Sequence, residues 1–183
     1  GTLSLSEAFA VQSMRFWRKS PYRRVLNDFN FFRFIIDVIR RRNAEGHRLS
    51  YPQFMLALFS DNGNVDEFLQ FINENRCGNS MDDTYALVVR RYNLIDGEHS
   101  KVNKQQTAFN DYGNTVFRVL QLTGFITVEY DGMIMLSVNS NRMRLYDELC
   151  AMDFTVPEET KDNLVGYFKL LGSFPSEIQK CIE

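Results

Sequence analysis

The sequence has little cysteine and no long hydrophobic run, and these two absences narrow the class of protein. Its 183 residues include three cysteines, Cys77, Cys150 and Cys181, which lie far apart and form no CxxC pair. An odd number of isolated cysteines argues against both a disulfide framework and a thiolate zinc site. Charged residues interrupt every apolar stretch before the length of about 18 residues that a membrane helix needs, and the N-terminus lacks a signal-peptide pattern. We therefore expect a soluble, cytoplasmic protein without a membrane segment.

Motifs of the common enzyme classes are also absent. The chain contains no GxSxG nucleophile elbow, no GxxxxGK[ST] phosphate loop and no GxGxxG dinucleotide motif. Its two histidines, His47 and His99, fall in predicted loops and have no neighbours at the spacing of metal ligands. The sequence thus predicts no catalytic residue and no metal site, and we expect no cofactor for this chain.

Two acidic motifs invite a catalytic interpretation, but the local pattern favours a structural one for both. Glu159-Thr160-Lys161 matches the E-x-K tripeptide of metal-dependent nucleases, which need it on a buried strand beside an aspartate. Here the tripeptide lies in VPEETKDNL, the pattern of a helix start with acids at the positive end of the helix dipole. Asp82-Asp83 follows Ser80 at the start of another predicted helix, where capping explains both acids.

Basic residues are concentrated in one segment. Between Ser13 and Arg48 there are ten arginine and lysine residues against three acidic ones, a net charge of +7. The whole chain has a net charge of −2, which leaves −9 for the remainder. Such asymmetry is typical of a local phosphate-facing surface on an otherwise acidic protein. A solvated face with scattered ion pairs is the alternative interpretation of the same arginines.

Apolar residues recur every three or four positions through most of the chain, which predicts a mainly α fold. Capping and breaking residues bound these periodic segments; Ser50, for example, precedes a segment with proline in its first turn. We expect helices at residues 6–19, 28–42, 51–59, 65–76, 81–92, 105–123, 140–150 and 157–171. Asn27 or Asp28 is expected to cap the second helix, and residues 96–104 are expected to form a loop.

The stretch GNTVFRVLQLTGFITVEYDGMIMLS, residues 113–137, changes its period at Gly124. Before this glycine the apolar residues have helical spacing; after it, two short apolar runs flank Asp131-Gly132, a dipeptide that supplies positive φ for a tight hairpin turn. A helix, a glycine stop and a β-hairpin form the second half of a winged helix. The expected organisation is a winged-helix-like domain at 1–152, followed by a C-terminal helical arm at 153–183. Within the domain we expect a helix bundle at about 6–95, a helix and wing at about 105–138, and a helix at 140–150.

The helix before the hairpin carries polar side chains suited to base recognition. In a winged helix this element enters the major groove, where amide and guanidinium groups recognise base edges. The candidates for base contacts are Lys104, Gln105, Gln106, Asn110, Asn114 and Arg118. An ordinary amphipathic surface helix has the same pattern, so the periodicity alone leaves both interpretations open.

The N-terminal basic segment, RFWRKSPYRR, interleaves basic and aromatic residues. Guanidinium groups match the geometry of phosphate oxygens, whereas Trp17 lies on an apolar stripe and is expected in the core. The candidates for phosphate contacts are Arg15, Arg18, Lys19, Arg23, Arg24, Arg40, Arg41 and Arg42.

Three segments together resemble the AlwI-type restriction endonucleases, which are type IIS enzymes with strand-nicking relatives. They are SMRFWRKSPYRR, FNFFRFIIDVIRRRNAEGHRLSYPQFMLALFSDNGNVDEFLQFINENR and DYGNTVFRVLQLTGFITVEYDGMIMLS, and YFKLLGSFPS is similar to the segment that follows them in the family. The resemblance implies the second DNA-recognition subdomain of such an enzyme, a helical winged-helix-like unit. Two departures from the family pattern are expected: no upstream winged-helix subdomain before residue 1 and no PD-(D/E)xK nuclease domain after residue 183.

The expected function is therefore recognition of double-stranded DNA by a domain of a type IIS-like restriction endonuclease. The resemblance implies that this chain alone is not an enzyme, that its parent is a site-specific type II deoxyribonuclease, and that Mg²⁺ serves only the nuclease domain. The implied partners are double-stranded DNA and the neighbouring domains of the parent enzyme. The alternative is a winged-helix module that docks a protein and does not bind DNA, which the acidic remainder and the pI near 5.8 favour.

Overall fold

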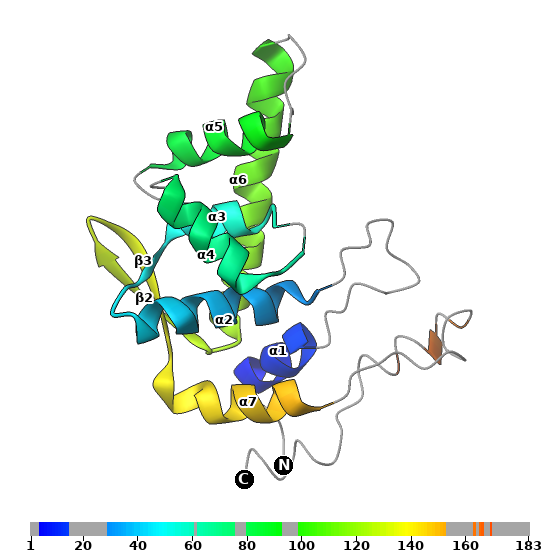
Figure 1. Cartoon of the computed structure of the whole chain (residues 1–183). Coiled ribbons are helices and arrows are strands. Elements are labelled where there is room, and N and C mark those ends of the chain that lie inside the picture. The colour runs from blue at the N-terminus through cyan, green and yellow to red at the C-terminus, as the bar shows by residue number, and fades with distance from the viewer. Residues whose placement is uncertain are drawn as a thin grey trace.

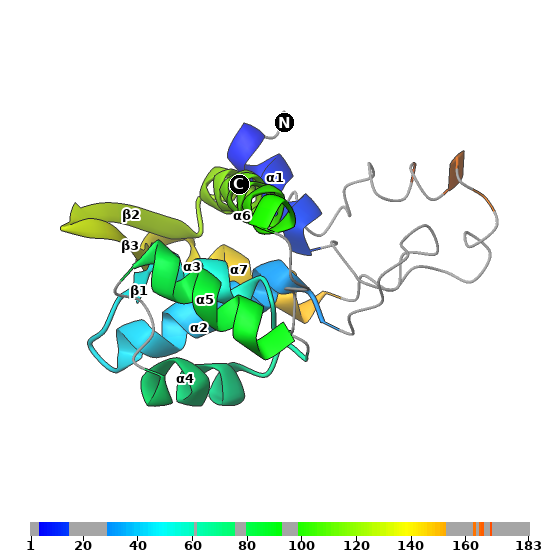
Figure 2. The same cartoon turned by 90° about the horizontal axis from the view of Figure 1, so that it is seen from above.

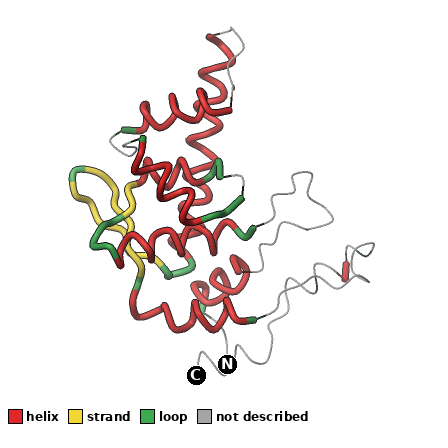
Figure 3. Tube along the Cα trace, in the orientation of Figure 1, coloured by secondary structure: helices red, strands yellow, loops and turns green. Residues whose placement is uncertain are grey.

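The fold is mainly α, as the sequence predicts, with one small antiparallel sheet at one side of the helical body (Figures 1 and 3). The computed structural model describes residues 4–14, 29–60, 62–75, 80–92, 99–152, 163, 165, 166 and 169. For residues 90–92 and 99–109 it describes the backbone alone. Within these residues no helix is both long enough and apolar enough to cross a membrane.

Seven α-helices and three strands make up the described part of the chain. The helices are α1 (Leu5–Met14), α2 (Phe31–Ala44), α3 (Tyr51–Ala57), α4 (Val65–Glu74), α5 (Met81–Tyr92), α6 (His99–Leu122) and α7 (Met143–Ala151), the last preceded by a 3-10 turn at Ser140–Arg142. The strands are β1 (Leu49–Ser50), β2 (Ile126–Asp131) and β3 (Met133–Val138). They form one antiparallel sheet in the order β1-β3-β2.

The hairpin is confirmed, and it projects from one side of the helical body in both cartoon views (Figures 1 and 2). Gly124 has a φ of 70° and follows the C-terminus of α6, so the left-handed conformation that glycine tolerates ends the helix there. At the tip, Gly132 alone separates the strands, with a φ of 68°. The sequence predicted that Asp131 and Gly132 form the turn together. Instead, Asp131 lies in β2, opposite Met133.

The short strand β1 was not predicted, because two residues are too few to show an alternating pattern. Leu49 pairs with Leu136 and Ser50 with Met135 in the middle of β3. This pairing ties the start of α3 to the hairpin, although the two segments are far apart in sequence. The hairpin therefore has a fixed connection to the helical body through β1.

Ser50 caps α3 as the sequence predicts. Its hydroxyl accepts a hydrogen bond from the backbone N–H of Gln53, whose side chain in turn accepts one from the backbone N–H of Ser50. This reciprocal capping box satisfies two N–H groups that the first turn leaves without helical partners. At α5, Ser80 accepts from the backbone N–H of Asp83 in the same way, as expected.

The cap of α2 is Asn30, and the prediction of Asn27 or Asp28 was wrong. The side-chain oxygen of Asn30 accepts a hydrogen bond from the backbone N–H of Arg33. Its side-chain nitrogen donates to the backbone carbonyl oxygens of Ser13 and Met14. Asn30 is 3% exposed, so it joins the end of α1 to the start of α2 inside the protein. That long-range contact, which no local pattern reveals, selects the cap.

The loop predicted at residues 96–104 is wrong from residue 99 onward, because residues 99–104 already belong to α6. His99 is accordingly the first residue of a helix and not a loop residue. Lys101 and Lys104 are good helix formers, and the helix continues beyond them, so the expectation of a loop from polarity alone was mistaken. Residues 93–98 lie outside the described part.

The core forms around α2, whose apolar stripe faces α1, α4 and β3. Ile35, Ile36 and Ile39 are fully buried there, together with Phe54 of α3 and Leu136 of β3. Their spacing of three and four residues is the helical period that predicted α2. These side chains come from α2, α3 and β3, so one core holds these helices and the hairpin together.

Several predictions fall on residues outside the described part. The first helix is confirmed from Leu5 to Met14, but its expected continuation to Lys19 is not described. The helix predicted at 157–171 and most of the C-terminal arm at 153–183 also lie outside it. The division into a domain at 1–152 and an arm stays a prediction.

Candidate functional site

Along its C-terminal half, α6 presents a polar face to solvent. Asn110, Asn114 and Arg118 follow one another at four-residue spacing, which puts them on one side of the helix. Asn114 and Arg118 are exposed and Asn110 is half-buried. Arg118 makes no hydrogen bond or ion pair with any other residue that the structure describes. Three of the six predicted base-contacting side chains are thus gathered on one face.

The other three predicted residues are Lys104, Gln105 and Gln106, which lie in the N-terminal half of α6. The structure describes their backbone as helical and does not describe their side chains. Their helical positions place them on the same element as Asn110 and Arg118, but their exposure stays a prediction.

The adjoining face of α6 packs closely against Met55 of α3 at Gly113. A Cβ atom at Gly113 would lie 2.1 Å from both Cε and Sδ of Met55, a distance that no real contact allows. Gly113 is buried, as are Phe117 and Leu120 on the same side of the helix. The absence of a side chain at Gly113 therefore lets the two helices approach and brings the start of α3 beside the polar face of α6.

A hydrogen bond from Tyr51 reaches across this helix crossing to Asn114. The Tyr51 hydroxyl donates to Oδ1 of the Asn114 side chain at 2.7 Å. The amide nitrogen of Asn114 is thereby turned away from Tyr51, with its two N–H groups left as donors. Since Asn114 is exposed, those donors face the surface of the protein.

The Tyr51 ring is fixed by two neighbouring aromatic rings. It stacks on Phe54 at a centroid distance of 5.8 Å and meets Phe117 edge to face at 5.0 Å. Phe54 and Phe117 are both buried. Burial raises the pKa of the Tyr51 hydroxyl above its ordinary value, so the group stays protonated and able to donate.

All three arginines at the end of α2 have partners within the protein. Arg40 and Arg41 form ion pairs with carboxylates, and Arg42 donates a hydrogen bond. Arg40 makes a two-pronged ion pair with Asp147 of α7, with Nη1 to Oδ1 at 2.6 Å, and this hydrogen bond raises the pKa of Arg40. Arg41 lies 3.5 Å from Glu45 and 3.8 Å from Asp66. Each of these pairs holds a guanidinium group that the sequence assigned to phosphate.

Arg42, the third of these arginines, donates to Oδ1 of Asn73 in α4 at 3.3 Å. This bond links the end of α2 to α4, and Arg42 is half-buried. The phosphate role predicted for Arg40, Arg41 and Arg42 would require each of them to leave or share a partner within the protein.

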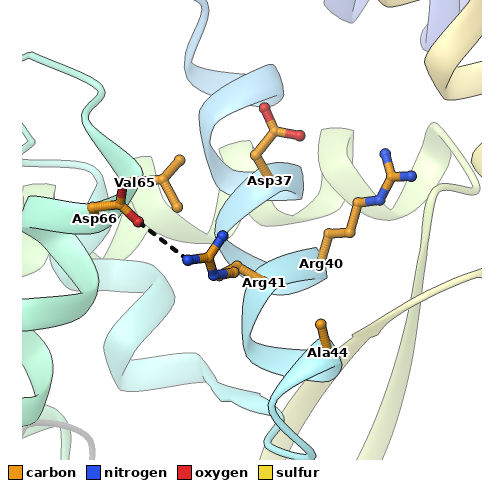
Figure 4. A pocket seen from close by; sticks show the side chains of 6 residues that line it. All are labelled: Asp37, Arg40, Arg41, Ala44, Val65 and Asp66. Carbon is orange, nitrogen blue, oxygen red and sulfur yellow. Dashed lines mark ion pairs between the residues drawn. The ribbon is translucent and has the colours of Figure 1, made fainter.

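An open pocket of about 410 Å³ lies between α2 and α4 beside these arginines (Figure 4). It is lined by Asp37, Arg40, Arg41, Ala44, Val65 and Asp66. In the close view the Arg41 guanidinium reaches across toward Asp66. Two arginines and two aspartates balance one another, so the lining has no excess positive charge to hold an anion.

Acidic side chains mark the outer part of the hairpin. Arg48 donates to Oε2 of Glu129 at 3.0 Å and also to the carboxylate of Asp131, so one guanidinium serves two acids of β2. Tyr130, the residue between them in sequence, is 80% exposed and lies on the opposite face of the hairpin, because side chains alternate along β2. The hairpin thus presents partly neutralised carboxylates on one face and an exposed aromatic side chain on the other.

The remaining candidates lie outside the described part of the chain. They are the phosphate candidates Arg15, Arg18, Lys19, Arg23 and Arg24, and the tripeptide Glu159-Thr160-Lys161. Within the described residues, no group of three or more His, Cys, Asp or Glu side chains is arranged to hold a metal ion. The expectation that this chain has no cofactor and that Mg²⁺ serves only a nuclease domain stays a prediction.

Sequence reasoning missed Tyr51 and Arg48, and each was hidden for the same reason. Both residues make their contacts across more than sixty positions of sequence, to Asn114 and to Glu129. A pattern within one helix or strand cannot indicate such a contact. The one local signal was that Tyr51 opens a strongly capped helix, which fixes its position but not its partner.

Comparison with known proteins gives one result. The family model described as AlwI restriction endonuclease matches residues 2–171. No curated protein matches the chain.

This match overturns one prediction from the sequence. We expected that the chain alone is not an enzyme, because it resembled a recognition subdomain and no catalytic motif was recognised. The matched family consists of enzymes, and the match covers nearly the whole chain. Absence of a familiar motif was therefore insufficient ground for assigning the chain to a non-catalytic fragment.

Proposed function

The chain belongs to the AlwI restriction endonuclease family, whose substrate is DNA, and we propose that its helical unit recognises double-stranded DNA through the exposed face of α6. The single observation that carries this proposal is the order of elements around the sheet. A helix, a short strand, a second helix, a later helix and a hairpin follow one another as α2, β1, α3, α6, β2 and β3. The strand order β1-β3-β2 supports the assignment of these elements to a winged helix, in which α4 and α5 would be an insertion.

In this arrangement α6 is the recognition helix and the hairpin is the wing. The recognition helix of a winged helix lies in the major groove, and its polar side chains contact base edges. Asn114 and Arg118 are exposed on the appropriate face, and Arg118 has its guanidinium free of other described residues. Arginine is the side chain best suited to the two acceptors of guanine. We assign base contacts to Asn110, Asn114 and Arg118, with Lys104, Gln105 and Gln106 nearer the N-terminus of the helix.

Phosphate contacts are proposed for the N-terminal basic segment. The segment at residues 15–24 follows α1, and α1 packs against α6. Its candidates are Arg15, Arg18, Lys19, Arg23 and Arg24. Arg40, Arg41 and Arg42 are weaker candidates, because each already has a partner in the protein.

The hairpin supports a second candidate function, the docking of a protein partner. Glu129 and Asp131 would repel phosphate, and the exposed Tyr130 between them is a side chain typical of protein interfaces. In this alternative the winged helix does not contact DNA. The two functions differ in the dependence of DNA affinity on salt concentration.

The test is a fluorescence-anisotropy titration of the chain against a labelled random-sequence duplex pool, in EDTA so that the DNA stays intact. The logarithm of the affinity should fall linearly with the logarithm of the salt concentration, because bound phosphates release counterions. Arg118→Ala should weaken binding, whereas Arg144→Ala, an exposed arginine on α7, should have little effect. Absence of binding at low salt, or equal effects of the two variants, would contradict the proposal.

A further inference from the structure

The contact between Tyr51 and Asn114 fixes what the recognition helix can offer to a base. A free asparagine side chain presents a carbonyl acceptor and an amide donor side by side, the pair that matches N6 and N7 of adenine. In this protein Oδ1 of Asn114 already accepts the Tyr51 hydroxyl at 2.7 Å. One of the two lone pairs of this oxygen is thereby occupied, whereas the amide nitrogen keeps both of its N–H donors.

Two donors match guanine better than adenine. In the major groove guanine presents two adjacent acceptors, N7 and O6, whereas adenine presents one acceptor and one donor. An adenine N6 donor would have to share an oxygen that Tyr51 occupies. The orientation of one amide therefore decides between the two purines.

The orientation is set before any DNA arrives. The Tyr51 ring is clamped between Phe54 and Phe117, and the capping box at Ser50 fixes the backbone from which Tyr51 extends. On the other side, the close approach at Gly113 fixes the part of α6 that carries Asn114. An amide held in this way loses less conformational freedom on binding than a free surface side chain.

We propose that Tyr51 is a positioning residue for base recognition: by holding the carbonyl of Asn114, it presents the amide N–H groups to DNA and selects guanine over adenine at the contacted base pair. Tyr51 need not touch the DNA itself. This inference rests on the proposed function, because it requires α6 to lie in the major groove.

The test compares sequence preferences of the whole chain and its variants. A random-sequence duplex pool is offered in EDTA, and the retained duplexes are sequenced. The unaltered chain should retain guanine at one position by about tenfold over adenine, which is the discrimination that one good base contact provides. Tyr51→Phe removes one hydroxyl and frees the Asn114 carbonyl, so the preference at that position should move toward adenine.

Three further variants separate positioning from a merely structural role. Asn114→Ala should abolish the preference at that position, and Tyr51→Phe should have no additional effect on the preference in that background. Asn114→Asp keeps an acceptor for Tyr51 but lacks the N–H donors, so it should also lose guanine even if Tyr51→Phe folds poorly. Tyr112→Phe, at an exposed tyrosine of the same helix, is the matched control and should leave the preference unchanged.

Each outcome has one meaning. If the unaltered chain selects a sequence and Tyr51→Phe selects the same one, the positioning role is wrong and the proposed function stands. If Tyr51→Phe weakens all sequences equally and lowers the melting temperature, Tyr51 is structural and the inference is again wrong. If the unaltered chain retains no duplex, or all duplexes equally, the proposed function fails and the inference fails with it.

Discussion

The Tyr146 hydroxyl donates a 2.8 Å hydrogen bond to the Asp37 carboxylate, and this pair joins α7 to the middle of α2. Tyr146 is 2% exposed and also contacts the carbonyl oxygen of Arg33 at 3.2 Å. Burial raises the pKa of Tyr146 far above its ordinary value, and the neighbouring Asp37 charge raises it further. The tyrosine is thus a permanent donor to an acid that lies largely inside the protein.

The first prediction concerns the pH dependence of Asp37. Burial raises the pKa of this carboxyl above 3.8, more than the Tyr146 hydrogen bond and the nearby Arg40 lower it. The folded state therefore binds the proton more tightly, and the resulting stabilisation is present below pH 3.8 and lost as the pH rises through the folded pKa. Asp37→Asn should gain stability relative to the unaltered chain across that same rise in pH. Urea unfolding at pH values on both sides of 3.8 measures the difference.

Tyr146→Phe is the control for this prediction, because it removes the donor and keeps the acid. It should destabilise the protein by about 1 kcal/mol at neutral pH, since a buried carboxylate loses a hydrogen bond. A constant difference in stability between Asp37→Asn and the unaltered chain at all pH values would contradict the assignment of a raised pKa.

The second prediction concerns the close contact of α6 and α3 at Gly113. In an exposed helix interior, glycine to alanine stabilises by up to about 1 kcal/mol. Here the new Cβ would overlap Sδ and Cε of Met55, so this fully buried side chain would have to repack. Overpacking of this kind costs about 1–3 kcal/mol, so Gly113→Ala should lower the free energy of unfolding. Chemical denaturation measures the change.

Gln121→Ala, at an exposed position on the same helix, gives the matched control. It should leave stability within about 0.5 kcal/mol, as most surface substitutions do. If Gly113→Ala stabilised the protein, the two helices would have to be farther apart than the Gly113 contact indicates.

The sequence predicted most of the fold because helix periodicity and capping are local properties. Ser50 with Gln53, and the glycines at 124 and 132, act within a few residues of their own positions. The misplaced cap of α2 shows the limit of such patterns. Asn30 caps α2 because its side-chain nitrogen also donates to the carbonyl oxygens of Ser13 and Met14. The sequence gives no sign of that distant contact.

The candidate site was predictable as a helix face but not as a geometry. Spacing alone put Asn114 and Arg118 on one side of α6. The partner of Asn114 depends on how α3 crosses α6, and the partners of Arg48 depend on the pairing of β1 with β3. Similarly, the arginines of α2 had the composition of a phosphate surface, and tertiary packing brought Asp147 and Asp66 to them. Charge counted along the chain does not include such neutralisation.

The third prediction concerns the capping box that fixes the start of α3. Ser50→Ala removes the acceptor for the Gln53 backbone N–H and should destabilise the protein by about 1 kcal/mol. Because Tyr51 is the next residue, the variant should also blur the preference between guanine and adenine if the positioning role is correct. Ser140→Ala, at an exposed serine, is the control and should change neither property. Thermal unfolding and the duplex selection measure the two effects.

The last prediction concerns the acids of the hairpin. If the hairpin lies beside DNA as a wing, Glu129 and Asp131 oppose the phosphates, and the double variant Glu129→Gln, Asp131→Asn should bind duplex more tightly, by about twofold for each charge at low salt. Arg48→Met should have the opposite effect, because it leaves both acids without their shared partner. Stability should change by less than about 1 kcal/mol in either variant, since the ion pairs are largely exposed.

Salt concentration separates this prediction from an effect on folding. The differences in affinity should shrink as salt rises, because screening weakens interactions between exposed charges. If neither substitution changes DNA affinity while Arg118→Ala still does, α6 contacts DNA and the hairpin does not. In that case the exposed Tyr130 would be better explained as a contact for a protein partner, because exposed aromatic side chains are typical of protein interfaces.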